Sequence, residues 1–193
     1  MAYLVIAATV LGLGWFGWVM TSRSGYESAT YKVVESDGSF EVREYPDLML
    51  VTTRAKFASQ GNDGSFGRLF KYISGANDSN SKVAMTTPVF MEPETEESAG
   101  QMGFVLPAKL AQSSIPNPAN ENVEIEKRGG GNFAVLRFSG QMNDATKTTM
   151  ESKLRAWMKK KGMSTDGKIE FAGYDPPWTP GLLRRNEVLI QVE

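Results

Sequence analysis

One order of secondary structure occurs twice along this chain, and it limits the possible folds more than any other feature. In the first half, residues 40–57 alternate in hydrophobicity and are rich in β-branched and aromatic residues, which is typical of a strand broken at Pro46. Asn62-Asp63 can then cap a helix that ends at Gly75. Two further runs that predict strands follow, at residues 83–91 and 102–106.

The second half repeats this order. Residues 133–138 predict a strand, and Asn143-Asp144 can cap a longer helix that ends at Gly162. Residues 168–174 and 187–192 predict the closing strands. Two such units indicate a pseudo-symmetric α+β domain in which two helices lie against one curved sheet. A groove between a helix and the strands is where a ligand could bind.

Composition excludes several classes of function. The chain has 193 residues, of which 41% are hydrophobic, so it can bury the core of one domain or of two small ones. Its net charge of −1 provides no field to attract nucleic acid, and we predict no nucleic-acid partner. The chain contains no Cys and no His, which excludes disulfides, thiolate or imidazole metal sites and Ser-His-Asp catalysis. We therefore predict no metal site, and what remains for any catalysis is carboxylate, Lys, Tyr or Ser chemistry.

The N-terminal segment differs from the rest of the chain. Residues 1–22 carry no charged side chain, and residues 3–20 are apolar apart from Thr9. A helix of about 20 residues spans about 30 Å, the hydrocarbon thickness of a bilayer. We predict a membrane anchor at residues 1–22 that contacts the membrane through residues 3–20, a linker at 23–30 and a folded domain at 31–193. A cleaved signal peptide and a buried core helix are the alternatives.

Charges near this segment favour one orientation. Arg23 and Lys32 lie on its C-terminal side, whereas no Lys or Arg lies on its N-terminal side. Because cytoplasmic flanks are enriched in Lys and Arg, the domain is expected on the cytoplasmic side of a single-pass membrane protein.

Two longer motifs point to a family. The first, KYISGANDSNSKVAMTTPVFM, covers residues 71–91, and the second, GYDPPWTPGLLRRNEVLI, covers residues 173–190. Through these motifs the chain resembles the SOUL heme-binding protein family over residues 31–193. The resemblance implies a distorted antiparallel β-barrel flanked by two helices and built from a duplicated βαββ unit, similar to gyrase-inhibitor-like small-molecule-binding domains.

The resemblance also implies non-covalent binding of heme or a related tetrapyrrole without catalysis. In animal heme-binding members the ligand lies against the first helix and beneath the late Tyr-Asp-Pro-Pro loop. A macrocycle buries apolar area against Phe and Leu, and its propionates pair with Lys or Arg. The corresponding residues here are Phe66, Leu69, Phe70, Lys71, Ile73, Tyr174 and Arg184. On helical spacing alone, the four apolar ones favour a core face over a pocket, and Met85 and Met91 favour a core over a cavity.

Iron ligation departs from the pattern of some family members. Because the chain has no His, heme iron would take Tyr, Met or Lys as its ligand, or no protein ligand at all. Thr179 stands where a basic residue of the late loop is expected in heme-binding members. Hydrophobic binding without an iron ligand is the favoured form.

The predicted function is therefore a membrane-tethered heme carrier or buffer, with no protein partner indicated. One alternative is a membrane-tethered small-molecule sensor or adaptor that binds no tetrapyrrole. The other is a hydrolase that depends on a glutamate in the groove. The candidate glutamates are Glu41, Glu44, Glu92 and Glu170.

Overall fold

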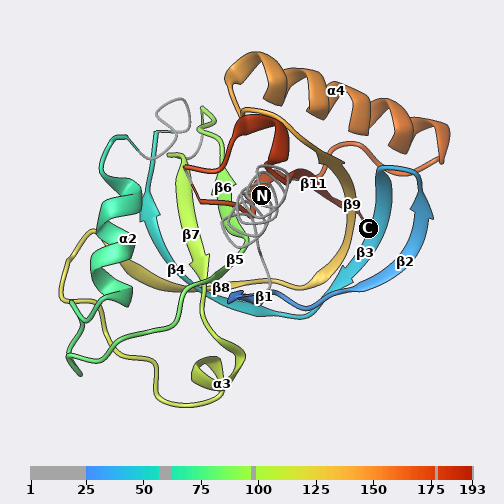
Figure 1. The fold of residues 1–193 in the computed structure, drawn as a ribbon. Helices are drawn as coiled ribbons and strands as arrows, with labels where there is room; N and C mark the ends of the chain where they lie inside the picture. The colour runs from blue at the N-terminus through green and yellow to red at the C-terminus, as the bar shows by residue number, and fades with distance from the viewer. Residues whose placement is uncertain (1–24, 57–61, 97–98, 177, 193) are drawn as a thin grey trace, which may run out of the picture.

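The computed structural model describes residues 25–56, 62–96, 99–176 and 178–192. Its main feature is a nine-stranded antiparallel sheet that curls into a half-barrel (Figure 1), with strand order β2-β3-β9-β11-β10-β6-β7-β4-β8. The strands are β2 (Lys32–Asp37), β3 (Phe40–Tyr45), β4 (Leu48–Arg54), β6 (Val89–Glu92), β7 (Gln101–Val105), β8 (Glu124–Arg128), β9 (Gly131–Phe138), β10 (Ile169–Gly173) and β11 (Asn186–Val192). A short parallel pair, β1 (Glu27–Ser28) and β5 (Thr86–Thr87), lies outside this sheet, and β1 falls within the segment predicted as a linker.

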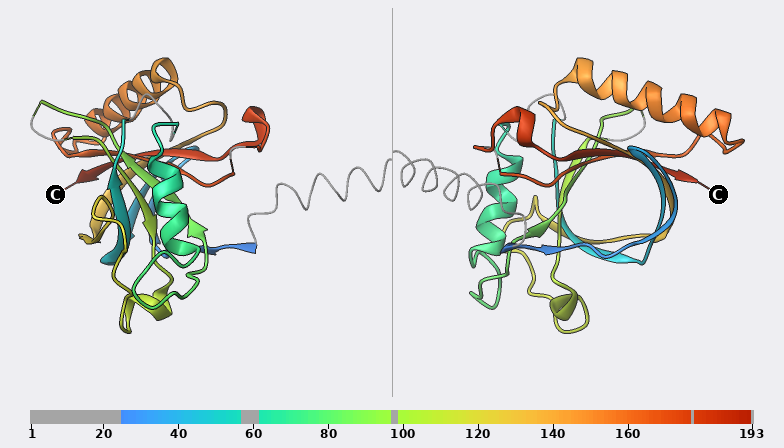
Figure 2. Two further views of the ribbon diagram at one scale, coloured as in Figure 1. Left: turned by 90° about the vertical axis from the view of Figure 1, so that its left-hand side faces the viewer. Right: turned by 45° about the vertical axis from the view of Figure 1, so that its right-hand side comes forward.

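Two helices pack on the outer face of the curl, as the two views of Figure 2 show. Helix α2 (Ser65–Ile73) packs on β4 and β7, and helix α4 (Asp144–Lys160) packs on β9 and β11. Shorter helical turns are α3 (Ala108–Ala111) and the 3-10 turn η3 (Gly181–Leu183). The predicted α+β class with a curved antiparallel sheet is confirmed.

The two halves of the sheet have the same topology, counted from β4 in the first half and from β9 in the second. The first half runs β4, α2, β6, β7 along the chain and β4-β7-β6 across the sheet. The second half runs β9, α4, β10, β11 along the chain and β9-β11-β10 across the sheet. Strands β6 and β10 pair with each other, so the two halves meet at the middle of the sheet.

The two helices begin in different ways. Asn143 caps α4 as predicted, because its side-chain Oδ1 accepts a hydrogen bond from the Thr146 amide at 2.9 Å. Helix α2 instead begins after Gly64, whose φ of 83° lies in the left-handed region that glycine adopts without strain. Asp63 still contributes, because its Oδ1 accepts from the Ser65 amide at 3.0 Å.

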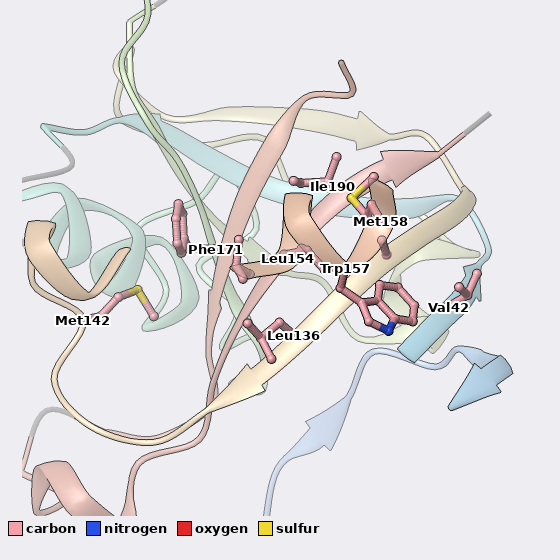
Figure 3. Packing of buried hydrophobic residues seen from close by; sticks show 10 residues of the cluster. Val42, Leu136, Met142, Leu154, Trp157, Met158, Phe171 and Ile190 are labelled. Carbon is pink, nitrogen blue, oxygen red and sulfur yellow. The ribbon is translucent and has the colours of Figure 1, made fainter. Parts of the chain in front are cut away.

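Three apolar clusters fill the domain. Under α4, the side chains of Leu154, Trp157 and Met158 pack onto Leu136 and Ile190 of the sheet (Figure 3). A second cluster lies between α2 and the sheet and includes Leu69, Tyr72, Val51 and Phe104. The third lies on the inner, concave face and contains Leu50, Phe90, Phe133, Val135 and Leu189. Both faces of the sheet are therefore packed, and any ligand must use a place that these clusters leave open.

The predicted membrane anchor, residues 1–22, lies outside the described residues. Over the ranges that the structure describes, no helix combines the length and the apolar character needed to cross a bilayer. Helix α4 is the longest of these, and it is amphipathic, with charged side chains such as Lys153 and Lys160 among its 17 residues. The prediction of a single-pass membrane protein is corrected accordingly, since no helix of the described part carries it.

Candidate functional site

A pair of aromatic side chains marks the surface of α2. The rings of Phe66 and Phe70 stack with centroids 6.2 Å apart and planes 14° from parallel. Phe66 also contacts the ring of buried Phe104 edge-on at 5.2 Å, whereas Phe70 is 51% exposed. The pair is thus anchored in the core at one end and open to solvent at the other.

Half-buried apolar residues continue from this pair across the outer face. Val89 on β6 pairs with Phe104, and Met91 lies two residues further along the same face. Met85 also packs at the margin of the α2 cluster, and Met91 touches the margins of both helix clusters. We call Phe66, Phe70, Met85, Val89 and Met91 the outer strip. It lies on the part of the outer face between the two helix clusters.

Gly173 at the end of β10 has no side chain, so the backbone of the sheet next to the outer strip is uncovered there. It pairs with Val89, and a Cβ built on Gly173 would meet Met91 Cε at 3.7 Å and no other atom within 4 Å. A flat ligand can therefore approach the backbone here more closely than over a residue with a side chain. The late loop begins directly after Gly173.

The base of the late loop is fixed by a charged cluster on the inner face. Both Nη atoms of Arg43 donate to the carboxylate of Glu187, at 2.7 and 3.0 Å. Arg185 donates to the same carboxylate at 2.6 Å, and so does the Tyr174 hydroxyl at 2.9 Å. The Arg185 amide donates to Asp175 at 2.6 Å. These bonds hold the loop in a single geometry at its point of attachment.

Burial and charge shift the pKa values within this cluster. Burial alone would raise the pKa of Glu187, but hydrogen bonds and charge from Arg43 and Arg185 outweigh it and hold that pKa below its ordinary value. Burial raises the pKa of Tyr45 to about 12 and raises that of Tyr174, with the Glu187 charge acting in the same direction. Glu187 is therefore ionised and Tyr174 neutral across the physiological range.

Comparison with known proteins assigns the family. The sequence model of the family described as "SOUL heme-binding protein" matches residues 26–191. The chain belongs to the SOUL family. Heme-binding protein 1 of Xenopus tropicalis is 30% identical over 185 residues, which cover 90% of this chain and 96% of the relative. Heme-binding protein 2 of Homo sapiens is 32% identical over 167 residues, covering 80% of this chain and 78% of the relative.

Solved structures support the fold of this SOUL domain. A hydrolase from Listeria innocua superposes with a TM-score of 0.58 at 13% identity, covering 83% of this chain and 94% of that one. An uncharacterized conserved protein from the same organism gives a TM-score of 0.59 at 11% identity, covering 80% and 92%. At such low identity the likeness concerns the fold alone.

The residues predicted to bind heme in this SOUL domain separate into three groups. Phe66, Phe70 and the exposed Lys71 lie on the surface of α2. Leu69, with no exposed surface, and Ile73 face the core. The other two lie outside α2: Tyr174 points to the inner face, and Arg184 in the late loop donates through Nε to the Thr179 carbonyl at 2.8 Å. The structure thus brings together only part of the predicted set.

The sequence singled out Phe66, Phe70, Met85 and Met91 of the outer strip but not Val89. Val89 nevertheless falls within the first family motif. The sequence favoured a core position for Met85 and Met91, and both are half-buried in the structure. For Val89 and Met91 the available signal was strand alternation: on β6 they flank Phe90, which points inward, so both point outward.

The four glutamates of the hydrolase alternative are paired with cations. Glu41 accepts from Arg43 at 2.6 Å, and Glu170 accepts from Arg128 at 2.7 Å. Glu92 lies 2.5 Å from Lys168, and exposed Glu44 lies 4.0 Å from Lys32. Each of these carboxylates thus already has a neighbouring cation as its partner.

Proposed function

We propose that the outer strip binds heme or a related tetrapyrrole non-covalently, as a carrier or buffer with no catalytic step. The observation that carries the proposal is the outer strip: the stacked pair of Phe66 and half-exposed Phe70 on α2, continued by Val89 and Met91 next to Gly173, whose backbone carries no side chain. Membership of the SOUL family and relatives described as heme-binding proteins support it.

The apolar surface is suited to a flat macrocycle. Burial of apolar area contributes roughly 25 cal/mol per Å², and the rings of Phe66 and Phe70 supply such area without a rearrangement of the core. The macrocycle would lie against these rings and over Gly173. Lys71, exposed in the last turn of α2, is the cation best placed to meet a propionate, because Arg184 already donates to Thr179.

The same geometry narrows the choice of iron ligand. Met85 and Met91 are the residues of the outer strip with an atom that can coordinate iron. Tyr174 is unsuitable, because its hydroxyl donates to Glu187 on the other face of the sheet and burial raises its pKa. Iron would thus have a thioether ligand or no protein ligand.

A hemin titration followed by absorbance tests the site. Wild-type protein is expected to saturate near one equivalent, whereas Phe70→Asp places a charge on the exposed ring position and is expected to bind at least about tenfold more weakly. Ser152→Asp, at an exposed position of α4, is the matched control and should bind as wild type does. Absence of saturable binding by the wild type, or equal binding by Phe70→Asp, would overturn the proposal.

A further inference from the structure

A cavity lies on the inner face of the sheet, opposite the outer strip. Its volume is about 190 Å³, and inward side chains of β4, β6 to β11 line it. Phe90 points into it, while the neighbouring Val89 and Met91 belong to the outer strip. The sheet therefore separates this inner cavity from the proposed heme surface, and the two can be tested independently.

A cationic side chain with one unpartnered nitrogen lies at this cavity. Arg128 lines it, and the side chain is only 8% exposed. Its Nε and Nη2 donate to Glu170 Oε2 at 2.9 and 2.7 Å, but Nη1 is buried without a hydrogen-bond partner among the described residues. Because a buried donor that lacks an acceptor is costly, Nη1 points to an acceptor oxygen supplied from outside the chain.

The ion pairs around the cavity leave one lining carboxylate without a cation. Arg128 pairs with Glu170 and Lys168 pairs with Glu92, whereas Lys127 pairs with Asp47, which does not line the cavity. Among the described residues, Glu126 therefore has no cation as its partner. Glu126 lies two residues before Arg128 on the same face of β8, about 7 Å away along the strand. A carboxylate on Arg128 and an ammonium near Glu126 would thus each meet an opposite charge.

The uncharged lining is part polar and part apolar, and the volume of the cavity limits the size of an occupant. Leu50, Phe90 and Phe133 form the apolar wall, and the Arg128 guanidinium lies 4.2 Å from the Phe133 ring centroid. A volume of about 190 Å³ is smaller than the roughly 300–1,000 Å³ of pockets for drug-sized ligands. The occupant is therefore a small molecule with a short aliphatic part.

We propose that the inner cavity binds a free α-amino acid with an aliphatic side chain. Its carboxylate accepts from Arg128 Nη1, its ammonium faces Glu126, and its side chain packs on Leu50, Phe90 and Phe133. This site is distinct from the outer strip and does not depend on heme binding.

Calorimetric titration of the purified full chain with three matched probes tests the class of ligand. Leucine carries both charged groups, 4-methylpentanoate lacks the ammonium, and 3-methylbutylamine lacks the carboxylate. Leucine is expected to bind at least about tenfold more tightly than either. If leucine gives no saturable heat, solvent satisfies Arg128 and the proposal is wrong; if 4-methylpentanoate binds equally well, the assigned contact with Glu126 is wrong.

Two variants test the location. Gln191→Trp places a bulky side chain at an exposed lining position of β11 and is expected to abolish leucine binding without touching Arg128. Asn132→Trp, at an exposed position of the adjacent strand that does not line the cavity, is the matched control. Arg128→Lys keeps the charge but removes Nη1, so its affinity for leucine should fall. Circular dichroism of this variant checks that the fold is retained. Leucine binding that survives Gln191→Trp would overturn the location.

Discussion

The two halves of the sheet share one strand order but differ in how far their helices cover it. At 1.5 Å per residue, the 17 residues of α4 extend about 25 Å and the nine of α2 about 14 Å. Trp157 on α4 is 7% exposed, whereas Phe70 on α2 is 51% exposed. The outer strip thus combines the aromatic pair of the shorter helix with the half-buried strand residues Val89 and Met91.

The inner face gives the largest expected effect in this comparison, because only the second half carries Glu187. Glu187→Gln would leave Arg43 and Arg185 without their shared carboxylate, and breaking a buried pair in this way costs about 3–5 kcal/mol. Urea denaturation at neutral pH measures the loss. A loss below about 1 kcal/mol, the range of exposed ion pairs, would show that the cluster contributes little to the second half.

The same residue gives the stability a dependence on pH. Since the pKa of Glu187 is lowered in the folded state, its contribution is complete above the ordinary Glu pKa of about 4.3 and is lost as the pH falls through the lower folded value. The wild type should therefore lose stability progressively below about pH 4.3, and Glu187→Gln should show a shallower decline. Urea midpoints measured across this range for both proteins compare the slopes.

A matched pair of core leucines probes whether both helices are equally anchored. Leu154 on α4 and Leu69 on α2 both have no exposed surface, so each Leu→Ala change is expected to cost about 2–5 kcal/mol. Chemical denaturation of the two variants makes the comparison. If Leu69→Ala costs far less than Leu154→Ala, then α2 is a weakly packed element and its short length is not the whole difference.

Substitution of Phe70 is expected to have the smallest effect on the free energy of unfolding but a clear effect on hemin affinity. Phe70→Ala removes a half-exposed ring and should change the free energy of unfolding by no more than about 0.5 kcal/mol. Hemin affinity should nevertheless fall in this variant. A large loss of stability with unchanged affinity would assign Phe70 to the core and remove it from the candidate site.

Much of the fold could be predicted because its signals are local. Asn143 and the glycines after each helix mark the helix ends, and alternation marks the central strands. The edge strands β2 and β8 were missed, because their sequences KVVESD and EIEKR are exposed along most of their length and lack the alternation of a half-buried strand. Edge strands with such charges resist pairing with other chains.

The candidate site was only partly predictable, since exposure depends on what packs across the domain. Phe66, Leu69 and Phe70 share one helical spacing, yet only Leu69 is fully buried. Tyr174 belongs to a family motif, but the period of β10 directs its side chain inward toward Glu187. Neither outcome follows from local sequence, because the first depends on the packing of α2 on β4 and β7 and the second on the pairing of β10 with β6.

The pairing of β10 with β6 also places Gly173 of the second half beside the outer strip of the first half. Val89 and Met91 come from one half of the sheet and Gly173 from the other, so neither half alone would form the complete surface. Two identical units joined at the same seam would present two equivalent surfaces, related by a two-fold axis. Here the two helices differ in length, so the two-fold symmetry is lost. The outer strip with Gly173 is therefore asymmetric, although the fold is built from two repeated units.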